Sequence, residues 1–92
     1  MKNGFEDFMQ ASINAANREL EGKYGISILD SFKKSSAKNR EIFAEIIKST
    51  VYGSHNYEQR FNRLREMGQN IEPLVNECAS SIMLKVVLSN II

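Results

Sequence analysis

The stretch Leu74–Leu88, LVNECASSIMLKVVL, decides the fold of this chain because it becomes apolar nearly all round. Ile and Val favour strands, so Ile82–Leu88 fits a strand as well as a helix. No second strand-like segment occurs elsewhere in the chain for it to pair with. The stretch therefore predicts a helix. A helix without a polar face is either central in a core or buried against another chain.

The start of this helix is marked by Asn70 and Pro73. An asparagine side chain can accept a backbone N–H at a helix N-terminus. A proline in the first turn costs no hydrogen bond, because the N–H that it lacks has no partner inside the helix. We therefore expect Asn70 to cap the last helix of the chain.

Three earlier segments repeat apolar residues every three or four positions, the spacing of one helix face. The first covers about 4–21 and ends at Gly22, and the second covers about 37–52 and ends at Gly53. The third has Ser54 as its expected cap and closes at Gly68. Its apolar stripe consists of Tyr57, Phe61, Leu64 and Met67.

A further short helix is indicated after Ser27, which can cap a segment carrying Ile28, Leu29 and Phe32. The connections between all these segments are short, which favours antiparallel neighbours. We therefore predict an all-α fold, a small bundle of four to five helices, with residues 1–92 forming a single domain.

The composition excludes several classes of protein. The 92 residues include one cysteine, Cys78, so no intramolecular disulfide can form and a reducing, cytoplasmic setting is expected. Acidic Glu6 and Asp7 stand where a signal peptide would be apolar. The apolar stretch Ile82–Ile92 is shorter than the roughly 20 residues of a membrane-spanning helix, and Lys85 interrupts it.

No residue pattern points to catalysis, so we expect no enzyme, no cofactor and no metal. A Cys78 nucleophile would need a base in contact with it, and His55 is the sole histidine of the chain. Cys78 lies in an apolar segment, where a free cysteine usually behaves as a small buried hydrophobic residue. One cysteine and one histidine fall short of the roughly four such ligands that zinc prefers. No glycine-rich phosphate loop occurs.

A positive middle segment supports one hypothesis, a nucleic-acid-binding regulator. Residues 31–65 carry eight basic and three acidic side chains, whereas the segments on either side are each net negative. Arg, Asn and Gln are the side chains that pair with guanine and adenine edges, and Lys contacts phosphates. A solvated positive face is the alternative. The candidate nucleic-acid residues are Lys33, Lys34, Lys38, Arg40, Asn56, Gln59, Arg60 and Arg63.

The leading hypothesis is a non-enzymatic protein-binding module, an adaptor, inhibitor or chaperone-like protein. The last helix is apolar all round, and each of the others offers it only one stripe, so part of its surface is expected to stay exposed. A homodimer is the default partner arrangement. The alternative is that the other helices cover this helix completely. The candidate interface residues are Met83, Val87, Leu88, Ile91 and Ile92.

Overall fold

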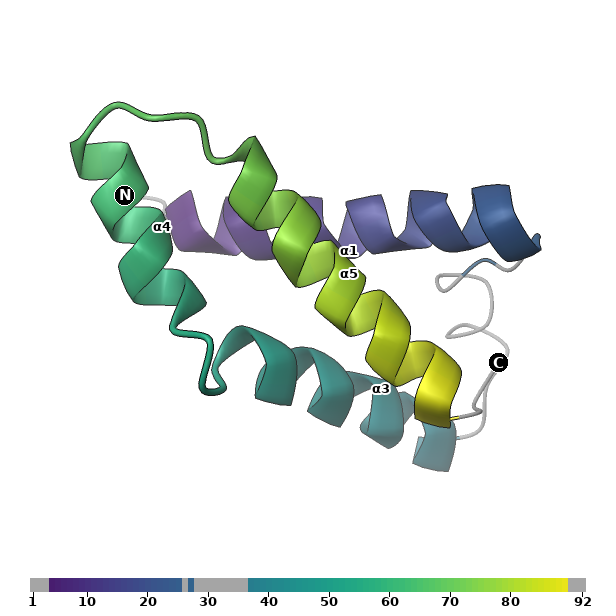
Figure 1. Ribbon diagram of the computed structural model, residues 1–92. Coiled ribbons are helices and arrows are strands. Elements are labelled where there is room, and N and C mark those ends of the chain that lie inside the picture. The colour runs from purple at the N-terminus through teal and green to yellow at the C-terminus, as the bar shows by residue number, and fades with distance from the viewer. Residues whose placement is uncertain (1–3, 26, 28–36, 90–92) are drawn as a thin grey trace.

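The computed structural model describes residues 4–25, 27 and 37–89, which form four α-helices and no strand (Figure 1). The helices are α1 (Gly4–Tyr24), α3 (Ala37–Val51), α4 (Tyr57–Glu66) and α5 (Glu72–Ser89). The all-α prediction is confirmed, and residues 82–88 are helix rather than strand. The short helix expected after Ser27 lies outside the described residues.

The last helix, α5, is the central element of the fold. In Figure 1 it crosses in front of α1 and α3, and it contacts α1, α3 and α4. Its most extensive contact is with α1, which also contacts α4. The residues that α5 buries recur at helical spacing: Leu74, Cys78, Ala79, Ile82 and Val86.

Small side chains allow α1 and α5 to pack closely. Ala15 and Ala16 on α1 and Ala79 on α5 are all buried, and the distance between packed helices depends on the size of the side chains at the contact. Ser12 is also buried on α1, where its hydroxyl donates to the Phe8 carbonyl at 2.9 Å. The polar group is thus satisfied within its own helix.

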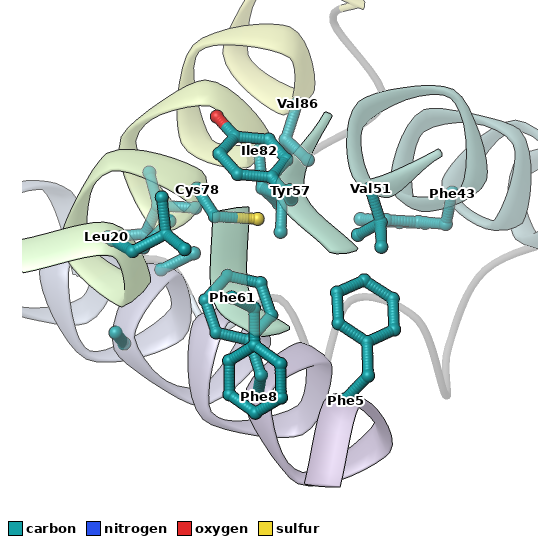
Figure 2. Packing of buried hydrophobic residues seen from close by; sticks show 14 residues of the cluster. Phe5, Phe8, Leu20, Phe43, Val51, Tyr57, Phe61, Cys78, Ile82 and Val86 are labelled. Carbon is teal, nitrogen blue, oxygen red and sulfur yellow. The ribbon is translucent and has the colours of Figure 1, made fainter. Parts of the chain in front are cut away.

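An aromatic cluster joins the N-terminal end of α1 to α4 (Figure 2). The ring centroids of Phe8 and Phe61 lie 5.2 Å apart, and Phe5 lies 5.5 Å from Phe8 and 5.9 Å from Phe61. These separations are within the range of favourable ring pairs. Tyr57 adds a fourth ring, 6.2 Å from Phe8. The two buried rings of α4 therefore attach this short helix to the core.

Two glycines in the left-handed region end α1 and α4. Gly68, at φ 65°, donates its N–H to Arg65, and Gln69 donates to Leu64, the paired bonds that close many helices. The predicted end of α4 is confirmed. For α1 the predicted end at Gly22 is wrong, because the helix continues to Tyr24 and the left-handed glycine is Gly25.

The starts of α4 and α5 differ in how well the sequence predicted them. The N–H of Glu72 donates to the Asn70 side chain at 3.1 Å, so the Asn70 cap is confirmed. The Ser54 cap is wrong, since Asn56 precedes α4 in a left-handed conformation without a side-chain capping bond. Asparagine tolerates this conformation better than most residues.

At the other end of α4, Met67 was predicted as part of the apolar stripe but follows the helix and is exposed.

A buried hydroxyl on α3 provides a test of the packing. Thr50 is fully buried, and its Oγ1 has no hydrogen-bond partner in the described part of the chain. Replacing Thr50 with valine keeps the shape and removes the unpaired group, so we expect unfolding to cost about 1 kcal/mol more. Urea denaturation measures the change, with exposed Ser49→Ala as the control. A destabilised Thr50→Val protein would mean that the hydroxyl has a partner.

Candidate protein-binding surface

The outer face of α5 carries three exposed apolar side chains in its C-terminal half. Leu84 is 60% exposed, Val87 48% and Leu88 73%. They occupy positions i, i+3 and i+4, so they share one face of the helix. Cys78, Ile82 and Val86, by contrast, line the opposite, buried face. We call Leu84, Val87 and Leu88 the α5 ridge.

The ridge includes only part of the predicted interface. Val87 and Leu88 lie on it, whereas Met83 is half-buried and packs against the core. Ile91 and Ile92 lie outside the described residues. Leu84 was missed, because a segment that is apolar all round does not show from sequence which side faces inward. The buried positions at four-residue spacing identify the inner side, and Leu84 then falls on the outer one.

The rest of the same α5 face is polar. Asn76, Glu77 and Ser80 are exposed in the N-terminal half of the helix. Between Cys78 and Ser89 the only charged side chain in the sequence is Lys85, which is half-buried. The ridge is therefore an apolar end on an otherwise polar helix face, and Lys85 is the one charged side chain on this half of α5.

A cleft of about 540 Å³ runs beside this face, between α1 and α5. Small residues, Ala15, Ala79 and Ser80, form part of its lining, and Met83 lies at the same cleft. Arg18 and Asn76 line both this cleft and a neighbouring one, so the two depressions adjoin along the helix pair. Ser80 and Met83 of α5 line the first cleft, whereas none of the three ridge residues lines either one.

The candidate nucleic-acid residues of α4 are divided between two environments. Gln59 and Arg63 are exposed, and with Asn62 they share one outward face at positions i, i+3 and i+4. Arg60 instead faces α5, where its two guanidinium nitrogens donate to the Glu77 carboxylate at 2.8 and 2.9 Å. Arg60 is therefore already held by a bidentate ion pair.

Neighbouring groups extend this ion pair into a small network. Arg60 donates to the backbone carbonyl of His55 and lies 5.5 Å from the centre of the Tyr57 ring. The Tyr57 hydroxyl lies 3.3 Å from the Ser81 hydroxyl, and burial raises the pKa of Tyr57. The hydrogen bonds from Arg60 lower the pKa of Glu77, while the same bonds raise the pKa of Arg60.

The lowered pKa of Glu77 predicts a pH-dependent contribution to stability. The ion pair stabilises the fold fully above the pKa of an unfolded glutamate, about 4.3, and this stabilisation is lost as the pH falls through the lower folded pKa. Both side chains are partly exposed, so screening limits the effect to about 1 kcal/mol or less. In urea titrations Glu77→Gln should be less stable than wild type at pH 7 and equal to it at pH 2. Glu58→Gln is the control, and a pH-independent difference would contradict the ion-pair explanation.

The predicted basic residues do not form one patch within the described chain. Lys38 and Arg40 are exposed in the first turn of α3, whereas the exposed face of α4 with Gln59 and Arg63 comes after the last turn of α3 in the chain. The 15 residues of α3 separate these two groups by about 20 Å of helix. Asn56 is exposed just before α4. Lys33 and Lys34 lie outside the described residues.

The residues weighed for catalysis are not arranged as a reactive pair. Cys78 is fully buried, and burial raises the pKa of its thiol. The interpretation of Cys78 as a small buried residue is confirmed. His55 is exposed and stacks on the Tyr57 ring at 5.4 Å. Within residues 4–25, 27 and 37–89, no three His, Cys, Asp or Glu side chains are grouped as metal ligands would be.

The helices were compared with membrane spans, and the chain with known proteins. Among the described helices, none combines the length and the apolar character needed to cross a membrane. The chain matches no known protein family, and neither a curated protein sequence nor a solved structure matches it significantly.

Proposed function

We propose that this chain is a non-enzymatic helical-bundle module that binds another protein, as an adaptor, inhibitor or chaperone-like protein does, and that it self-associates through its C-terminal helix, α5. The observation that carries the proposal is the α5 ridge, three contiguous apolar side chains on the outside of the central helix. Single exposed apolar residues are ordinary on a protein surface, whereas apolar side chains grouped on one helix face are candidates for an association site.

The position of the ridge adds a second argument. Its backbone belongs to α5, the helix that packs against α1, α3 and α4. Because α5 packs against three other helices, the backbone that carries the ridge needs little ordering on binding. The polar remainder of the α5 face fits the rim of an interface, which is usually more polar than its centre.

Site-specific photocrosslinking in the native cell tests this proposal. A photoreactive residue replacing Leu88 should give protein adducts, whereas the same residue replacing exposed Gln59 on α4 should give far fewer. Both positions are exposed, so general accessibility does not produce the difference. Equal yields at the two positions would contradict the proposal.

A nucleic-acid-binding role is the second candidate, favoured by the exposed face of Gln59, Asn62 and Arg63 on α4. Fluorescence anisotropy with random-sequence duplex DNA over a salt series tests it. Micromolar binding that weakens steeply with salt, and that weakens further in Arg63→Ala, would support this candidate. The absence of binding at low salt would remove it.

A further inference from the structure

We draw no further inference here: the strongest candidate, the two adjoining clefts between α1 and α5 with Arg18 lying at both, rests on a stripe of small residues and on exposed polar side chains, and nothing in the described part of the chain shows what occupies them.

Discussion

Replacing Phe61 with alanine is expected to lower the free energy of unfolding by about 3–5 kcal/mol. Phe61 is buried, and its ring contacts the rings of Phe5 and Phe8. The substitution removes the apolar contacts and leaves a cavity that the surrounding helices fill only in part. It also removes one of the two buried aromatic anchors of α4.

Thermal and urea denaturation measure this loss. In a domain of this size each kcal/mol lowers Tm by roughly 4–8 °C, so the shift is large. Tyr52→Ala is the matched control, because Tyr52 also contacts the Phe5 ring, at 5.9 Å, but is 59% exposed. We expect the control to cost about 1 kcal/mol or less. Similar losses in both variants would contradict the placement of Phe61 at the centre of the aromatic cluster.

The second large effect is expected from an aspartate on the inner face of α5. Ile82 is fully buried, so Ile82→Asp places an unpaired charge in the core and also removes apolar contacts. The combined cost exceeds about 5 kcal/mol, comparable to the whole stability of a small domain. We expect the variant to be largely unfolded at neutral pH by circular dichroism.

Leu84→Asp is the control for this prediction, two residues along the same helix. Aspartate is a poorer helix former than both isoleucine and leucine, by at most about 0.7 kcal/mol, so most of the difference between the variants reports burial. Leu84 is 60% exposed, and its variant should remain folded with a change in stability of about 1 kcal/mol or less. Two unfolded variants would show that the outer face of α5 is also buried within the monomer.

The sequence predicted the helices well because their apolar spacing is a local property. The stripes that begin at Phe5 and at Tyr57 are visible from residues three and four apart, and Gly68 and Asn70 mark helix ends by their own conformational preferences. Gly22 was mistaken for a helix end, because a glycine can also continue a helix at a modest cost.

The candidate surface was less predictable, because it depends on how the helices pack. The sequence indicated that the other helices would not cover all of the apolar surface of α5. Its own pattern, however, does not show that Leu84 is exposed while Met83 packs against the core. Likewise, Arg60 looked available for nucleic acid until the packing of α4 on α5 brought it to Glu77, 17 positions away in the chain. Contacts of this kind arise between helices and leave no periodic signal.

We propose that the chain self-associates through the α5 ridge. Sedimentation velocity from low to high micromolar concentration tests it most directly, with wild type compared with Leu84→Asp/Leu88→Asp. We predict that wild type shifts from monomer toward dimer as its concentration rises, and that the folded double variant stays monomeric throughout. A wild type that remains monomeric over the whole range, or a double variant that dimerises equally well, would contradict the claim.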